Sequence, residues 1–417
     1  MSETRPPINW TTALFLVGSF AVAVVGTPLY LWRFGAVWFD LAHFVTMAWV
    51  TGLSITVGYH RLYAHRSFDA AWPVRLATLA FGAAAFEASA LGWASEHRYH
   101  HRFTDRDGHP YDPHSIERGF FHAHMGWLLR YRQPALPLSN VADLAKDPLV
   151  AWQHRWFVPL AAGFGLGLPA AVGAAHAAWS GGSLAVGALG GFLIGGCARL
   201  VAVHHATFLI NSLAHTMGRQ PYDSSQSSRD SAILAFFTFG EGYHNFHHAF
   251  QSDYRNGVRP WHWDPGKWAI WMLSKVGLAR NLRRTRPETI LMAKVEQARL
   301  VFEKRLAAAQ VELSDQAAAV LRDLNERLDE TYRRFRLLYA EHAKLAKRPP
   351  AEQGERYEEL RRELQRMRRS LVELARACRA RQRRLLSPTR AYGGQRIGSS
   401  ATETSSATAV RGTPTLT

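Results

Sequence analysis

Histidines gather in three short stretches of this 417-residue sequence. The stretches HRLYAH, HRYHH and HNFHH begin at residues 60, 97 and 244, and a further histidine ends the stretch NSLAH, which begins at residue 211. Together they supply nine of the chain's 20 histidines: His60, His65, His97, His100, His101, His215, His244, His247 and His248. Neutral imidazole binds iron, copper, nickel and zinc, so these residues indicate metal binding without naming the metal.

The spacing of the histidines predicts how they share a helix face. In HxxHH the three histidines lie on one face of a helix, with neighbouring side chains about 5–6 Å apart. Asn211 and His215 are four residues apart and converge in the same way. His60 and His65 are five apart and would diverge by about 140° on a regular α-helix. We therefore expect these two to serve two different ions or to straddle a helix end.

Any one of these stretches could be ordinary surface or part of a structural zinc site. A structural zinc ion takes four ligands, often including cysteine, whereas nine imidazoles suit two ions with open coordination positions. The sequence contains no HExxH motif, which disfavours a zinc protease.

Long apolar runs predict the elements that position the histidines. Residues 8–32 contain no Asp, Glu, Lys or Arg, residues 34–58 contain only Asp40, and residues 156–198 again contain none. A bilayer core needs about 20 apolar residues, and the third run divides at WSGGS, residues 179–183. The sequence therefore predicts an all-α membrane protein with four spans in two hairpins, at about residues 9–32, 36–58, 157–178 and 184–209.

The distribution of basic residues predicts the orientation. Arg33 is the only basic residue at the two hairpin tips, whereas residues 61–155 and 219 onward are rich in arginine. Basic residues are in excess on the cytoplasmic side, so both termini, both long loops and a helical di-metal domain are expected there. A fifth crossing at residues 76–93 would place the first two histidine stretches on opposite sides. We expect instead a helix packed inside the cytoplasmic domain or at the interface.

The composition changes after the membrane part, which we place at residues 1–285. Residues 286–386 are rich in Ala, Glu, Leu, Lys and Arg with helical spacing, interrupted by RPPAEQGER, which predicts a coiled-coil hairpin in the cytoplasm. Its expected role is self-association or partner docking, and the alternative is a solvated helical appendage. Residues 387–417 are rich in Ser, Thr and Gly and are expected to be disordered.

The order HRLYAH, HRYHH, NSLAH and HNFHH within four spans resembles the membrane fatty acyl desaturases, closest to the stearoyl-CoA type. The resemblance covers about residues 9–282 and includes DPH, RGFF, GWLL and GEGYHNFHH. It implies a non-haem centre of two iron ions, dioxygen as co-substrate, and insertion of a cis double bond, most often at carbon 9 (Δ9). It also implies that the nine histidines are the iron ligands, with Asn211 holding metal through water.

The resemblance also implies substrate-binding residues. Trp93 and Thr207 match positions that line the bend of an acyl tunnel, and Glu87 stands where a glutamine is usual. Arg130 and Arg132 match basic residues that meet the phosphates of CoA; alternatively, they form a basic surface against anionic lipid.

Several polar residues are candidates to support this centre. Carboxylates that fix the imidazole tautomers are expected among Glu96, Asp105, Asp107, Asp112, Asp230 and Glu241. His204 and His205 are expected to support ligands or line the tunnel, and Arg199 to pair between helices.

The expected partners follow from the excess of basic residues and from the cofactor motifs that the C-terminal extension lacks. There are 50 Lys and Arg against 33 Asp and Glu, which indicates an anionic partner; we assign it to membrane lipid and not to nucleic acid. The C-terminal extension has no cysteine cluster and only one histidine, so a separate electron donor such as a ferredoxin or a b-type cytochrome is expected. The substrate is expected to be a fatty acyl thioester, with CoA favoured over a carrier protein, or an acyl lipid. Alternative functions are a di-iron hydroxylase or monooxygenase, and a non-enzymatic membrane scaffold acting through its coiled coil.

Overall fold

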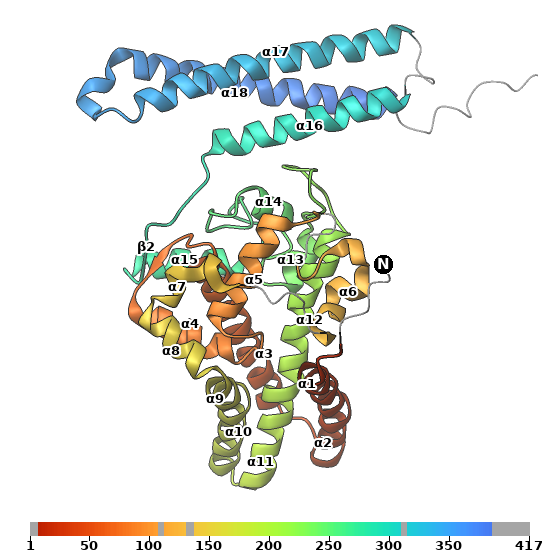
Figure 1. Cartoon of the computed structure of the whole chain (residues 1–417), viewed down its shortest axis with the longest axis vertical. Helices are drawn as coiled ribbons and strands as arrows, with labels where there is room; N and C mark the ends of the chain where they lie inside the picture. Colours follow the sequence, from red (N-terminus) through yellow and green to blue (C-terminus); the bar gives the residue numbers. More distant parts are fainter. Residues whose placement is uncertain (1–6, 107–111, 131–136, 310–314, 386–417) are drawn as a thin grey trace, which may run out of the picture. The chain divides into compact units, whose positions relative to one another are not determined.

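The computed structural model describes residues 7–106, 112–130, 137–309 and 315–385 (Figure 1). The chain divides into two compact units, Met1–Val301 and Phe302–Thr417. The described part is almost entirely helical, and its only sheet pairs β1 (Asp69–Ala70) with β2 (Ala279–Arg280) in antiparallel orientation. The expected all-α class is therefore confirmed. The expected disordered tail, Asp107 and Arg132 lie outside the described residues.

Four helices are long and apolar enough to cross a bilayer, as the sequence predicts: Trp10–Phe34, Trp38–Ala64, Phe157–Trp179 and Leu184–His215. They are built from α1 (Trp10–Ala21), η1 (Val22–Gly26), α2 (Thr27–Phe34), α3 (Trp38–Leu53), η2 (Ser54–Ala64), α9 (Phe157–Ala162), η6 (Gly163–Gly167), α10 (Leu168–Trp179), α11 (Leu184–Gly190), η7 (Gly191–Ala198), α12 (Arg199–Ser212) and η8 (Leu213–His215). The protein is an integral membrane protein. Its second and fourth helices continue beyond the expected ends and carry His60 and His215 themselves.

The segment considered as a fifth span forms a short helix instead. α4 (Trp72–Ala83) has 12 residues, fewer than a bilayer crossing needs. The carbonyls just past its end meet the fourth span, where Ala84 accepts a hydrogen bond from Arg199 (2.7 Å) and Ala85 contacts the ring nitrogen of His204 (2.6 Å). Arg199 also donates to Gly165 of the third span, so it links helices through carbonyls, as a polar group inside a membrane must find partners.

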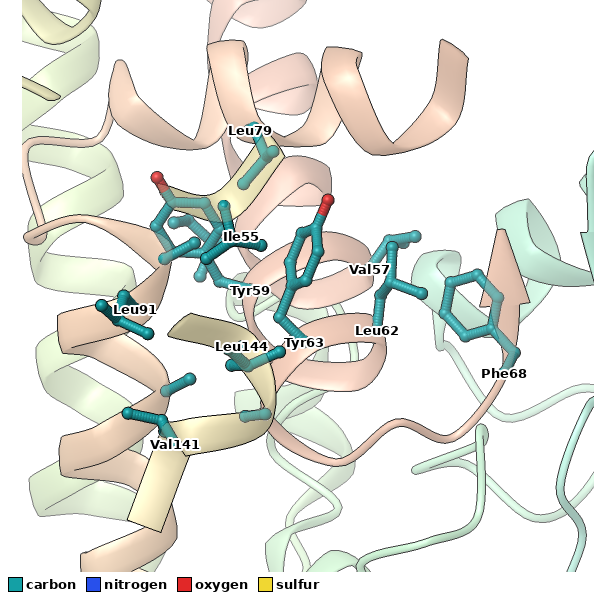
Figure 2. Packing of buried hydrophobic residues seen from close by; sticks show 14 of the residues in the cluster. Ile55, Val57, Tyr59, Leu62, Tyr63, Phe68, Leu79, Leu91, Val141 and Leu144 are labelled. Atoms are coloured by element: carbon teal, nitrogen blue, oxygen red, sulfur yellow. The ribbon is translucent and has the colours of Figure 1, made fainter. Parts of the chain in front are cut away.

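A buried apolar cluster supports the helix that carries the first histidines (Figure 2). Tyr59 and Tyr63 of η2 pack with Leu79 of α4, and all three are at most 3% exposed. Gly82 of α4 lies directly against the Tyr59 ring, so that a Cβ there would lie 2.4 Å from a ring carbon. This close packing holds η2 in one place relative to α4.

The remaining helices of the first unit surround this core (Figure 1). They are α5 (Ala90–Phe103), η3 (Ile116–Arg118), α6 (Phe120–His124), η4 (Gly126–Leu129), η5 (Leu138–Val141), α7 (Ala142–Ala145), α8 (Pro148–Arg155), α13 (Ala232–Phe237), α14 (His244–Ala249) and α15 (Pro265–Lys275). α5 begins at a serine cap, where the Ser89 hydroxyl accepts a hydrogen bond from the Gly92 amide (3.2 Å).

The C-terminal part contains three helices, α16 (Pro287–Ala309), α17 (Asp315–Leu345) and α18 (Pro350–Leu385). α17 and α18 pack side by side as a hairpin (Figure 1). Their buried residues recur every seven positions, at Leu321, Leu328 and Phe335 in α17 and at Leu364, Leu371 and Cys378 in α18. A seven-residue apolar repeat is typical of coiled coils, which remains the prediction for this hairpin.

Candidate metal centre

Four separate elements bring the nine histidines together. η2 and the residue after it carry His60 and His65, α5 carries three, η8 ends at His215 and α14 carries the last three. They form two groups in which the ligand nitrogens lie within 4.8 Å of one another. Site A contains His60, His65, His97, His101 and His247, and site B contains His100, His215, His244 and His248.

His60 and His65 belong to the same site, so the expectation that they serve two different ions is wrong. η2 is π-helical, and the His65 amide donates to the His60 carbonyl five residues earlier (3.0 Å). This wider turn places residues five apart on one side, where an α-helix would separate them. His65 also follows the last residue of the helix, in agreement with the alternative that the pair straddles a helix end.

The Nε2 atoms point inward at both sites. In site A, His60 and His247 approach to 2.9 Å, His65 and His97 to 2.7 Å, and His101 and His247 to 2.8 Å. In site B, the His215–His244 and His244–His248 distances are 3.1 and 3.0 Å.

The opposite ring nitrogens are held by polar side chains. His60 Nδ1 lies 3.0 Å from Glu241, and His100 Nδ1 lies 2.9 Å from Asp112. An ionised carboxylate accepts hydrogen bonds and cannot donate them, so the imidazole proton is on Nδ1 and the Nε2 lone pair faces inward. Acceptors in these positions orient the ring and increase its basicity as a ligand.

Two further histidines of site B are held by residues without charge. His248 Nδ1 lies 2.9 Å from the Gln226 amide oxygen, and His215 Nδ1 lies 2.7 Å from the Ser227 hydroxyl. Ser227 donates in turn to Asp105 (2.8 Å). Asp105 is thus one of the expected carboxylates, but it acts through a serine.

Burial keeps six of these imidazoles neutral. Desolvation, followed by the neighbouring histidines, lowers the pKa well below the ordinary value for His65, His97, His101, His244, His247 and His248. Burial raises the pKa of Glu241, but His60 and Arg61 outweigh it and hold the pKa at about 2. Neutral imidazole next to an ionised carboxylate is the protonation state that metal binding requires.

This arrangement fits a pair of metal ions. Converging lone pairs about 3 Å apart repel each other unless a cation lies between them. The described residues of sites A and B supply only imidazole nitrogens, a donor set that suits iron, copper, nickel or zinc. Two such groups side by side provide for two ions.

Glu241 is the centre of a buried polar network. Besides His60, it accepts hydrogen bonds from Thr56, from Arg61 (3.1 Å) and from Asn256 (2.7 Å). Arg61 also pairs with Asp264 at 2.9 Å. Every oxygen of this carboxylate is thus engaged, which limits the rotation of the carboxylate and therefore of the His60 ring.

The other expected supporting residues lie in different places. Asp230 accepts a hydrogen bond from the backbone amide of Phe246 (3.0 Å) and so holds α14. Glu96 lines the cavity described below. Gln226 and Ser227 were missed from the sequence because they lie in a serine-rich loop with no periodicity, and nothing in the sequence marks them as partners of histidines.

A cavity of about 340 Å³, with a partly apolar and partly polar wall, reaches site A at His97. Its wall includes Trp93, which stacks on His97 with ring centres 4.8 Å apart. Thr207, Glu87 and Asn211 also line it, which brings the expected substrate residues and the expected water-mediated ligand into one space. The apolar part of the wall comes from Phe15, Leu16, Phe86, Trp127, Leu128 and Phe208.

The remaining expected residues are Arg130, His204 and His205, and they lie in three different places. Arg130 is exposed, outside this cavity's lining, and pairs through its backbone with Ile8. His204 lines the cavity, whereas His205 contacts His124 of α6 at 3.1 Å. Neither belongs to site A or site B, in agreement with the expectation that they are not ligands.

The chain thus combines an integral membrane fold with two all-histidine sites, and a cavity reaches one of these sites at His97. The chain matches the fatty acid desaturase family over residues 36–271 and belongs to that family. It is 39% identical to the probable acyl-CoA desaturase of Schizosaccharomyces pombe and 39% identical to acyl-CoA desaturase 1 of Saccharomyces cerevisiae, over 71% and 69% of this chain. These matches span only 59% and 55% of the two yeast proteins. The sn-1 stearoyl-lipid 9-desaturase of Anabaena variabilis is 31% identical over 68% of this chain and 96% of its own length.

Proposed function

We propose that this protein is a dioxygen-dependent fatty acyl desaturase that inserts a cis double bond into a saturated acyl chain. The double bond is proposed to lie at Δ9 and the chain to be carried as a CoA thioester. The observation that carries the proposal is the cavity, with aromatic side chains in its wall, that includes Trp93 and reaches site A at His97, together with the converging imidazole nitrogens of sites A and B. The names of the two yeast relatives support acyl-CoA as the substrate.

Two iron ions are proposed as the cofactor, one held by the five histidines of site A and one by the four of site B, with Asn211 contributing through water. When bound, iron would use dioxygen, two external electrons and two protons to remove two hydrogens from an unactivated pair of methylenes, with two waters as the other product. The chain's own residues bind, orient and shield the substrate.

The cavity selects and positions the acyl chain. Aromatic side chains such as Phe15, Trp127 and Phe208 exclude water and favour an apolar chain, with about 0.8 kcal/mol for each methylene buried. Trp93 lies between this chain and the His97 ring and so fixes how closely a methylene pair approaches site A. Arg130 and Arg132, which lie outside the four spans in the sequence, are proposed to meet the phosphates of CoA.

The topology is proposed to place the metal centre and both termini in the cytoplasm. Support comes from Arg33, the only basic residue at the hairpin tips, against the arginine-rich long segments. The electrons are proposed to come from a separate ferredoxin or b-type cytochrome. Self-association through residues 286–386 is also proposed, whereas the seven-residue repeat of buried residues supports the packing of α17 on α18 within one chain.

Expression in a host that lacks unsaturated fatty acids tests this function. Mass spectrometry of the host lipids should show loss of two hydrogens at one position, with carbon 9 expected. His247→Ala should abolish the product, because His247 Nε2 meets both His60 and His101. Gain of an oxygen atom would identify a hydroxylase instead, and unchanged acyl chains with metal bound would favour a scaffold.

A further inference from the structure

Glu87 enters the acyl cavity on a strained loop. The residues on either side, Phe86 and Ala88, have backbone φ angles of 56° and 71°. These values lie in the left-handed region, which residues other than glycine rarely adopt. Such conformations are unfavourable and persist only where the surroundings enforce them. The loop is thus held in a conformation that aims Glu87 at the cavity.

The fourth span enforces this conformation. Arg199 donates to the carbonyl of Ala84 (2.7 Å), and the His204 ring nitrogen lies 2.6 Å from the carbonyl of Ala85. These carbonyls belong to the two residues directly before Phe86, the first strained residue. The loop therefore cannot withdraw Glu87 from the cavity without breaking buried hydrogen bonds.

The carboxyl group of Glu87 is incompletely satisfied. Its Oε1 accepts a hydrogen bond from the Thr207 hydroxyl (2.8 Å), whereas its Oε2 is buried and has no hydrogen-bond partner among the described residues. An ionised carboxylate in this position would bear a large desolvation cost with no cation paired to it. Burial accordingly raises the pKa of Glu87 to about 7, although Thr207 and Trp93 lower it.

We propose that Glu87 acts in the cavity wall as a neutral carboxylic acid, and that an apolar acyl chain occupies the cavity only while this carboxyl is protonated. This role rests on the proposed function and adds to it the requirement that the Glu87 carboxyl is protonated when the chain binds. A chain that displaces water from beside Glu87 removes the remaining solvation of the carboxylate, so binding of the chain and binding of a proton favour each other.

Among the described residues, no charged side chain forms an ion pair with Glu87 that would stabilise its ionised form. On the fourth span, Arg199 is engaged by the carbonyls of Ala84, Gly165 and Gly195, and His204 by Ala85. On the second span, the Tyr59 hydroxyl accepts a hydrogen bond from Gln153 (2.6 Å). Glu96, His97 and His114 also line the cavity.

Binding of stearoyl-CoA to the metal-loaded, full-length protein in detergent tests the role without turnover, under anaerobic conditions and without reductant. The neutral fraction of a carboxyl with a pKa of about 7 falls to about one tenth at pH 8, so the apparent dissociation constant should rise about tenfold from pH 6 to pH 8. Calorimetry in two buffers of different ionisation enthalpy should show uptake of about one proton per chain bound at pH 8.

Two variants separate Glu87 from other titrating groups. Glu87→Gln has the same shape and no charge, so its affinity should be equal at the two pH values and its proton uptake should vanish. Glu117→Gln removes an exposed carboxyl of η3 and should keep the wild-type dependence.

Equal wild-type affinity at pH 6 and 8, or the same pH dependence in Glu87→Gln, would overturn the role of Glu87 and leave the proposed desaturase function standing. Absence of stearoyl-CoA binding at both pH values would contradict the proposed substrate as well.

Discussion

The carboxylate of Glu241 lies 3.0 Å from Nδ1 of His60, although the two residues come from different ends of the membrane domain. The contact sets the tautomer of His60 and turns its Nε2 toward His247. Within the described residues it is the direct carboxylate contact of site A, and that of site B joins Asp112 to His100. The two sites can therefore be perturbed separately.

Glu241→Gln should weaken metal binding at site A. The amide oxygen can still accept from His60, but the negative charge that supports the imidazole and balances Arg61 is lost. Loss of such a partner typically costs 10–100-fold in metal affinity. Metal content per chain, measured by mass spectrometry after dialysis against a weak chelator, should fall, while Asp143→Asn, at a partly exposed ion pair with Arg98, should keep the wild-type content. Unchanged metal content would contradict the supporting role of Glu241.

Asp112→Asn should weaken site B and spare site A. Asp112 is buried, and its charge is held by His100, which outweighs the effect of burial and lowers its pKa. The same dialysis should leave about one iron per chain, because His100 is the only residue of site B that this carboxylate contacts. Equal loss from both sites would show that the two ions bind as one unit and not as separable sites.

Gly82→Ala should disturb site A from a distance. The new methyl group would lie 2.4 Å from the Tyr59 ring, next to His60 on η2. Overpacking of this kind costs about 1–3 kcal/mol and would displace η2. The midpoint of thermal unfolding and the iron content should both decrease. Gly18→Ala is the matched control, because nothing lies within 4 Å of its new methyl group and alanine favours a helix.

Leu328→Asp should open the C-terminal hairpin. Leu328 is 2% exposed and lies midway in the seven-residue repeat of α17. A buried charge without a partner destabilises a helix pair, so self-association measured by light scattering in detergent should be lost. Leu337→Asp, on the same helix but 73% exposed, should have no such effect. Loss of desaturation without a change in self-association would assign the hairpin a role other than assembly.

The membrane helices and the histidine convergence could be predicted from sequence because both depend on simple periodicities. Uncharged runs mark the spans, and HxxHH puts three rings on one helix face. The turn at His60 and His65 could not be predicted in this way, because the usual helix repeat does not apply to a π-helical segment.

The loop around Glu87 shows a second limit. Phe86 and Ala88 are residue types that give no signal for left-handed backbone, and their conformation depends on Arg199 and His204, more than 100 positions later. The support that Gln226 and Ser227 give to site B likewise depends on tertiary contacts and not on local pattern.

The distance along the chain between the two halves of site A has a consequence for biosynthesis. His60 and His247 are 187 residues apart, so the first histidines are inserted with the second span long before their partner has been synthesised. A metal ion bound to both closes a loop of that length and acts as a crosslink that the unfolded chain lacks. We therefore expect the supply of the proposed iron ions during membrane insertion to affect how much of this protein reaches its folded state.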